Sequence, residues 1–192
     1  MKKQIILASK SLRRSELLHN IGIEFKVHPS NFDEKDTHLS PEILALHNAK
    51  GKARDVAKHY KNALIIGVDT VGAYKDHILN KPRDDKDALR ILKTISGTTH
   101  YVVSAICIID TKTGKTLSVT EKTAIQMDKL TLKQMKDYIK SGEGVDKAGG
   151  YAIQGLGSLF IRKIEGDYFN VVGLPIYRLR KLMEKIGLQL TT

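Results

Sequence analysis

Short apolar runs and segments of helical periodicity alternate along the whole chain. The run 63–68 is apolar at almost every position, which is typical of a central strand buried on both faces. Similar patterns predict strands at 5–8, 23–27, 100–110, 115–129 and 159–164, with a hairpin over 71–79 that turns near Lys75-Asp76. Helices are predicted at 12–21, 41–60, 84–95, 131–139 and 175–186. This alternation predicts a mixed α/β sheet flanked by helices.

Capping residues mark several of these boundaries. Ser40-Pro41 places a serine N-cap directly before a proline, the residue favoured at the first helical position. Gly22 follows the first predicted helix as a C-cap, and the glycine-rich stretch 144–157 is expected to be a loop. The helix that begins at Pro41 is expected to bury Ile43, Leu44, Leu46 and Val56.

The composition indicates a chain that can build its own core. It has 192 residues, of which 41% are hydrophobic, enough for one domain of ordinary size without disulfides. The one cysteine, Cys107, lies in an apolar run and is expected to be a buried thiol and not a nucleophile. No signal peptide or apolar run of membrane-spanning length occurs, so we expect a cytoplasmic protein with no membrane contact.

The net charge of the chain indicates which classes of partner it binds. The formal net charge is +11, from 32 basic and 21 acidic residues, which favours phosphorylated partners such as nucleotides or nucleic acids. Tryptophan is absent and aromatic residues make up 6%, so stacking platforms for bases are sparse. We therefore expect no specific nucleic-acid binding. A non-enzymatic nucleic-acid-binding protein remains the alternative class, and its affinity would depend strongly on salt.

A serine turn joins the first predicted strand to the first predicted helix. Ser9 and Ser11 form the turn, and Arg13 and Arg14 lie in the first turn of the helix. Cations at the positive end of a helix dipole oppose it unless an anion binds beside them. The segment therefore predicts a phosphate site. The alternative is a pair of solvated arginines behind serines that only cap the helix.

Asp69-Thr70 directly follows the central apolar run. Ligands tend to bind at the carboxyl edge of strands in α/β sheets, where a carboxylate can hold Mg²⁺ or orient a water toward phosphorus. The alternative is an aspartate that caps the next turn. Lys52 and Lys81 are either phosphate contacts or solvated lysines.

Further candidates lie in two loops. Asp33-Glu34, and Glu143 with Asp146, either complete a metal site or are ordinary loop acids. Gln154 follows in the glycine-rich stretch, where glycines permit close approach of a ligand. A carboxamide can donate to a ring oxygen and accept an imide N–H, so it matches uracil or thymine. The alternative is a glycine-rich turn without a ligand.

Several motifs occur in a fixed order over nearly the whole chain. The segment 7–18 reads Leu-Ala-Ser-Lys-Ser-Leu-Arg-Arg-Ser-Glu-Leu-Leu. It is followed by Gly51-Lys52-Ala53, Gly67-Val68-Asp69-Thr70-Val71, Lys81-Pro82, Ser96-Gly97 with His100, Gly142-Glu143, Asp146-Lys147-Ala148-Gly149 and Val171-Val172-Gly173-Leu174-Pro175. Each motif is weak alone, but together they are specific. The chain thus resembles the Maf family, the septum-formation-inhibitor-like nucleotide pyrophosphatases.

The resemblance implies a fold and a reaction. The fold would be one domain over 1–192, elongated and two-lobed around a central cleft, similar to inosine triphosphate pyrophosphatase and often a homodimer. The reaction would be hydrolysis of a nucleoside triphosphate to the monophosphate and pyrophosphate, with Mg²⁺ or Mn²⁺ as cofactor. Tyr151-Ala152-Ile153-Gln154-Gly155 resembles the dTTP/UTP branch, whereas the 7-methyl-GTP branch typically carries Ser-Glu-Gly.

The resemblance also implies roles for single residues. Asp69 matches the proton acceptor, and Arg13, Thr70 and Gln154 match positions linked to substrate choice. Ser9, Arg14, Glu34, Lys52 and Lys81 match other cleft positions. Together with the chemistry above, this predicts that Asp69 and Glu34 hold the metal and that Ser9, Ser11, Arg14, Lys52 and Lys81 bind phosphates.

The sequence departs from the family pattern at Leu12, Gly72 and Asn80, where proline, an apolar residue and glycine are usual. None of these changes removes a reactive group, so activity is expected. The expected enzyme hydrolyses dTTP and UTP, and modified pyrimidine triphosphates as well. The alternatives are the same reaction on 7-methyl-GTP or another non-standard nucleotide, and a non-enzymatic nucleic-acid-binding or septation-regulating protein.

Overall fold

The computed structural model describes residues 3–34, 39–75 and 77–190. Its strands are β1 (Gln4–Leu7), β2 (Lys26–Val27), β3 (Ala63–Tyr74), β4 (His77–Leu79), β5 (Thr99–Asp110), β6 (Thr116–Met127) and β7 (Ile161–Glu165). Its α-helices are α1 (Leu12–Asn20), α2 (Pro41–Ala57), α3 (Asp85–Ile95), α4 (Leu132–Lys140), α5 (Tyr168–Val172) and α6 (Ile176–Lys185). Two 3₁₀ turns, η1 (Ala148–Gly150) and η2 (Leu156–Phe160), lie in the glycine-rich loop. No helix in these ranges is long and apolar enough to cross a membrane.

The strands of the described chain form one mixed sheet in the order β2-β1-β3-β5-β6-β7, with β4 also paired to β3. β1 runs parallel to β2 and β3, and the remaining pairs are antiparallel. The predicted mixed α/β class is confirmed. The division into two lobes stays a prediction.

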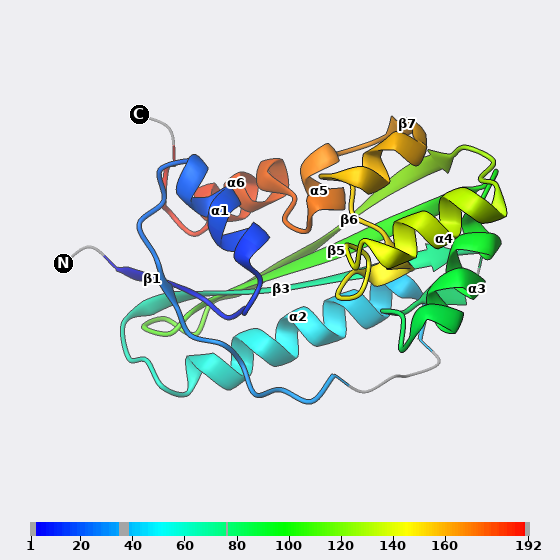
Figure 1. Ribbon diagram of the computed structural model, residues 1–192. Helices are drawn as coiled ribbons and strands as arrows, with labels where there is room; N and C mark the ends of the chain where they lie inside the picture. The colour runs from blue at the N-terminus through cyan, green and yellow to red at the C-terminus, as the bar shows by residue number, and fades with distance from the viewer. Residues whose placement is uncertain (1–2, 35–38, 76, 191–192) are drawn as a thin grey trace.

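The central strands bury side chains on both faces, as their apolar runs predict. Leu64, Ile66 and Val68 of β3 pack in the cluster that contains residues of α1 and α6, whereas Ile65 and Val71 pack against α2. Figure 1 shows α1 and α6 on one side of the sheet and α2 on the other. A third cluster joins α3 and α4 to the N-terminal end of β5 and the C-terminal end of β6.

Helix α2 lies very close to the sheet because alanines face it. A Cβ added to Gly67 of β3 would lie 2.2 Å from the carbonyl oxygen of Ala49, so only glycine fits there. The buried positions of the helix are Leu44, Ala45, Asn48, Ala49, Ala53 and Val56, while Leu46 is partly buried. The predicted burial of Ile43 is wrong: its side chain is 55% exposed, because the alanine stripe and not the bulkiest residue faces the sheet.

Several boundaries differ from the predictions. The expected strand 23–27 is paired only at β2, α2 ends at Ala57, and the short helix α5 was not expected. The hairpin over 71–79 is confirmed, although Asp76 of its turn lies outside the described residues.

β3 does not end at residue 68 but continues to Tyr74, because it pairs with β5 as far as Ala73 and Tyr101. Asp69 therefore lies within a long strand and not at its end.

Candidate active site

A gap in the sheet places Asp69 at the surface of a cavity. β5 covers one edge of β3 along almost its whole length. The other edge is paired with β1 only as far as Ile66 and with β4 only from Gly72 onward. β1 leaves the sheet at Ser9, where the chain turns into α1. The strand segment that contains Asp69 and Thr70 therefore has an unpaired edge, and polar side chains from neighbouring segments gather there.

The cavity at this gap has a volume of about 1230 Å³. Ligand cavities in proteins are commonly about 300–1,000 Å³, so the space can hold a nucleotide. Every predicted site residue lines it: Ser9, Ser11, Arg13, Arg14, Glu34, Lys52, Asp69, Thr70, Lys81 and Gln154. These residues come from β1–α1, the loop after β2, α2, β3, the β4–α3 connection and the glycine-rich loop. The spacing along the chain alone could not show this convergence.

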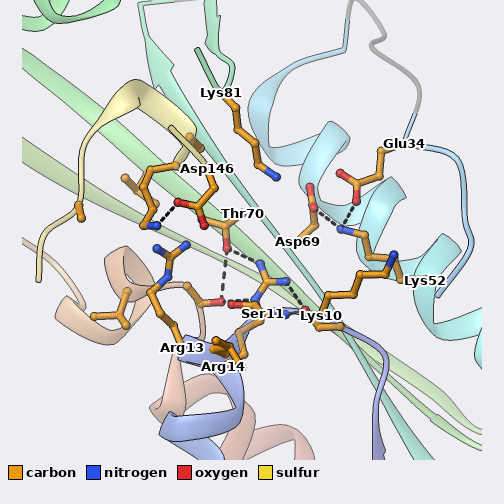
Figure 2. A pocket seen from close by; sticks show the side chains of 18 of the residues that line it. Lys10, Ser11, Arg13, Arg14, Glu34, Lys52, Asp69, Thr70, Lys81 and Asp146 are labelled. Atoms are coloured by element: carbon orange, nitrogen blue, oxygen red, sulfur yellow. Dashed lines mark hydrogen bonds and ion pairs between the residues drawn. The ribbon is translucent and has the colours of Figure 1, made fainter. Parts of the chain in front are cut away.

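Two side chains of α2 hold the Asp69 carboxylate, one at each of its oxygens. Lys52 donates to its Oδ1 over 2.6 Å, and the Asn48 amide donates to its Oδ2 over 3.1 Å. Lys52 Nζ also lies 2.7 Å from Glu34 Oε1, so one ammonium bridges the two carboxylates (Figure 2). Asp69 is only 4% exposed, and its orientation is therefore fixed.

The Arg14 side chain lies along the unpaired edge of β3, where it binds Val68 and Thr70. Its guanidinium donates to Ser9 Oγ, to the Val68 and Gly173 carbonyls and to Thr70 Oγ1, at 2.9–3.1 Å. Burial lowers its pKa from the usual value, and the nearby Asp69 charge opposes that effect. Since four of its five N–H groups are already used, Arg14 can offer little to a phosphate. Its geometry is that of a structural cross-link between α1, β3 and the segment before α6, and its predicted phosphate contact stays a prediction.

Arg13 is placed differently from its neighbour. Its Nε is buried and has no partner in the described part of the chain. Figure 2 shows its side chain extending toward Asp146 on the opposite wall of the cavity. The pKa of Asp146 lies below its usual value, chiefly because of the hydrogen bond from Lys147 and in smaller part because of the Arg13 charge. Because Arg13 lines the cavity and, among the described residues, lacks the cross-links of Arg14, it is the arginine of the pair whose guanidinium can face a ligand.

The other predicted residues lie around this centre. Ser9 Oγ accepts from Arg14 and from the Ser11 amide, so the serine turn is organised by Arg14. The Ser11 side chain makes no capping hydrogen bond to the helix. Thr70 Oγ1 lies 2.8 Å from Ser104 Oγ. Lys81 extends toward Asp69 in Figure 2.

Oxygen donors suited to a divalent metal are present but few. In the described ranges no group of three or more His, Cys, Asp or Glu residues is placed to hold an ion. Asp69 and Glu34 converge on Lys52, and Oδ1 of Asn48, whose amide binds Asp69, is buried without a partner among the described residues. Mg²⁺ usually binds through one or two carboxylates together with substrate phosphates. The residues therefore fit a metal that is shared with a phosphorylated ligand.

Two residues of the site were missed from the sequence. Asn48 holds Asp69, and its signal was a polar residue four positions before Lys52, on the same face of a helix otherwise lined by alanine. Phe32 lines the cavity, and a Cβ on Gly51 would lie 2.4 Å from its ring. No periodicity in the loop that carries Phe32 could have indicated this contact.

Comparisons with known proteins agree with the geometry. The family model described as "Maf-like protein" matches residues 4–186. A dTTP/UTP pyrophosphatase of Methanosarcina barkeri is 42% identical over 190 residues, which are 98% of this chain and 96% of that protein. Proteins of the same name from Dictyoglomus turgidum and a Thermoanaerobacter species are 43% and 45% identical, covering 99% and 95% of this chain and 100% and 96% of theirs.

Among solved structures, that of the Staphylococcus aureus Ham1 protein has a TM-score of 0.47 and 15% identity, over 65% of this chain and 72% of that chain. That similarity is too distant to add to the assignment. The family model covers nearly all of the chain, and the relatives cover it at more than 40% identity. The chain belongs to the Maf family.

Proposed function

We propose that this protein hydrolyses dTTP and UTP to the nucleoside monophosphate and pyrophosphate, and that modified pyrimidine triphosphates are substrates as well. The observation that carries the proposal is the set of full-length relatives named dTTP/UTP pyrophosphatase, at 42–45% identity. A cavity of nucleotide size supports it, because that cavity contains a fixed carboxylate, several cations and a carboxamide.

The side chains suggest a division of labour. Arg13, Lys52 and Lys81 neutralise the triphosphate, as cations at fixed positions do most effectively. Asp69 accepts a proton from a water as the water oxygen bonds to the α phosphorus. The bond from that phosphorus to the bridging oxygen breaks, and pyrophosphate leaves with the electron pair. Asp69 suits this role because two hydrogen bonds from α2 fix its orientation.

A divalent metal, Mg²⁺ or Mn²⁺, is proposed as the cofactor, with Asp69 and Glu34 as its protein ligands. When bound, such an ion withdraws charge from phosphate oxygens and lowers the pKa of a bound water. Lys52 keeps the two carboxylates close together, which otherwise repel each other. Gln154 also lines the cavity, from the glycine-rich loop, and its carboxamide can pair with the imide edge of a pyrimidine.

A panel of triphosphates tests the proposal. dTTP, UTP, CTP, GTP, dATP and 7-methyl-GTP are incubated with Mg²⁺ or Mn²⁺ in ¹⁸O-labelled water. The expected products are pyrophosphate and a labelled monophosphate, formed fastest from dTTP and UTP. Label in pyrophosphate or in orthophosphate would refute attack at the α phosphorus. Faster turnover of 7-methyl-GTP would move the substrate to that class, and salt-dependent binding of DNA without any turnover would support the non-enzymatic alternative.

A homodimer in the cytoplasm completes the proposal. Light scattering coupled to gel filtration checks the first part, with a mass near twice the 21.4 kDa of the chain as the expected result. A mass equal to one chain would contradict it.

A further inference from the structure

The loop that carries Gln154 is held at both of its ends by two side chains. At one end, the Tyr138 hydroxyl of α4 accepts the Ala152 amide over 3.0 Å. At the other end, Glu143 accepts the Leu156 amide on Oε1 over 2.8 Å and the Gly157 amide on Oε2 over 2.9 Å. Between these points, Gln154 is exposed and lines the cavity.

Glu143 and Tyr138 also bind one another, so the two fixed points form one unit. The Tyr138 hydroxyl donates to Glu143 Oε2 over 2.8 Å. Burial acts to raise the pKa of Glu143, but the hydrogen bonds from Gly157, Tyr138 and Leu156 outweigh it and bring the pKa below its usual value. Glu143 is therefore a carboxylate that accepts three donors of the protein.

The chain is shaped around this carboxylate. Gly155 adopts a φ of +126°, which side chains rarely allow. A Cβ at Gly155 would lie 2.0 Å from Glu143 Oε1, so the glycine is required for the carboxylate to approach the loop. The residue next to Gln154 thus permits the close approach of Glu143.

We propose that Glu143 is a positioning residue for base selection: although it also lines the cavity, its carboxylate oxygens accept hydrogen bonds from the loop backbone and thereby fix the Gln154 carboxamide where the base is read. The inference rests on the proposed pyrimidine triphosphate activity. Glu143 acts through the loop backbone, so its effect appears in the choice of base and not in the handling of phosphates. Tyr138 supports the same loop from its other end.

The substitution Glu143→Gln tests this with little change of shape. A carboxylate can accept all three donors, whereas a carboxamide has one acceptor oxygen and turns an NH₂ group toward at least one N–H of the loop. The loop then moves, and the kcat/KM ratio of dTTP over GTP is expected to fall about tenfold, the effect of losing one hydrogen bond to a charged group. The change is expected mainly in KM for dTTP.

A double variant separates positioning from general damage. Gln154→Ala alone should lower the same ratio. Glu143→Gln added to Gln154→Ala should lower it no further, because both act through the same carboxamide. Asp137→Asn is the matched control, since Asp137 lies beside Tyr138 in sequence but, within the described ranges, forms its ion pair with Lys133 on the surface of α4. It should leave the ratio unchanged.

Two outcomes would overturn the inference. One is an equal loss for all triphosphates in Glu143→Gln, and the other is additive losses in the double variant. The ratio is also measured as binding of dTMP against GMP, which needs no turnover. Amide exchange at Leu156 and Gly157 should become about tenfold faster in Glu143→Gln. Unchanged exchange is a third outcome that would overturn the inference, because it would show that Glu143 does not hold the loop. An inactive wild type that still shows the binding and exchange effects would refute only the proposed function.

Discussion

The ammonium of Lys52 lies 2.6 Å from Oδ1 of Asp69, inside the gap that β1 and β4 leave beside β3. Helix α2 supplies this contact, and one turn earlier it supplies the amide of Asn48 to the other oxygen. The carboxylate is therefore held in one orientation by a rigid helix that packs tightly on the strand. A base whose direction is fixed before substrate binds loses little entropy when it reacts.

Replacing Asp69 by asparagine should abolish pyrophosphate release while the fold is kept. The side chain keeps its size, but an amide cannot accept the proton of the attacking water. We expect kcat to fall by about a hundredfold or more. Pyrophosphate release by the purified variant measures this, with its circular dichroism and Tm as the check on folding. Turnover like that of the wild type would rule out Asp69 as the proton acceptor.

Replacing Asn48 by leucine tests the orientation of Asp69 separately from its chemistry. Leucine has a similar volume but no donor, so Asp69 Oδ2 loses its hydrogen bond. The change also removes the Oδ1 of Asn48, which is buried and has no partner in the part of the chain that the structure describes, and this limits the cost to stability. We expect kcat to fall by about tenfold with little change of Tm. A large loss of Tm with unchanged kcat would show that Asn48 supports only the fold.

The architecture could be predicted further than the site. Apolar runs identify strands buried on both faces, and caps identify helix starts, as Ser40 and Thr131 do by accepting amides in their first turns. Ile43 was misplaced because the pattern ranks residues by hydrophobicity, whereas a sheet under close contact selects alanine. The extent of β3 depended on its partner β5, which lies far along the chain.

The site shows the same limit in its chemistry. Most of its members could be found from the chain because they follow an apolar segment or lie in a motif, whereas Asn48 and Phe32 were missed. The different environments of Arg13 and Arg14 could not be found this way, since both lie in the same helical turn. Arg14 is a cross-link because the edge of β3 is unpaired at Val68, whose carbonyl accepts from Arg14, and because the carbonyl of Gly173, distant in sequence, accepts from it as well.

This difference predicts that the same substitution lowers stability at Arg14 and weakens substrate binding at Arg13. Arg14→Lys keeps the charge but cannot reach four acceptors at once. It should lower the free energy of unfolding by on the order of 3 kcal/mol, and Tm by roughly 6–12 °C. Arg13→Lys should change stability by less than about 0.5 kcal/mol but raise KM for the triphosphate, because Arg13 lines the cavity and its Nε has no partner in the described part of the chain. Urea unfolding and initial rates measure both. Equal stability losses would contradict the assignment of Arg14 as the cross-link.

A buried histidine predicts how stability depends on pH. His100 of β5 is 1% exposed, its Nε2 lies 2.7 Å from the Tyr151 hydroxyl, and its Nδ1 has no partner in the described chain. Burial lowers its pKa from 6.5 to about 4. Between these values the unfolded chain binds a proton that the folded chain does not, so stability is complete above pH 6.5 and falls as pH decreases toward 4.

The expected loss between pH 6.5 and pH 5 is about 1.6 kcal/mol, because the unfolded histidine is half protonated at pH 6.5 and the full cost of about 1.4 kcal/mol per pH unit applies only well below that value. Urea unfolding at the two pH values measures it. His100→Gln has no titrating ring, so its stability should change less over the same interval, even if it is lower at both values. The acids whose pKa lies below the usual range, such as Glu143 and Asp110, titrate beneath this window and do not obscure it. An identical pH dependence in wild type and His100→Gln would show that another group is responsible.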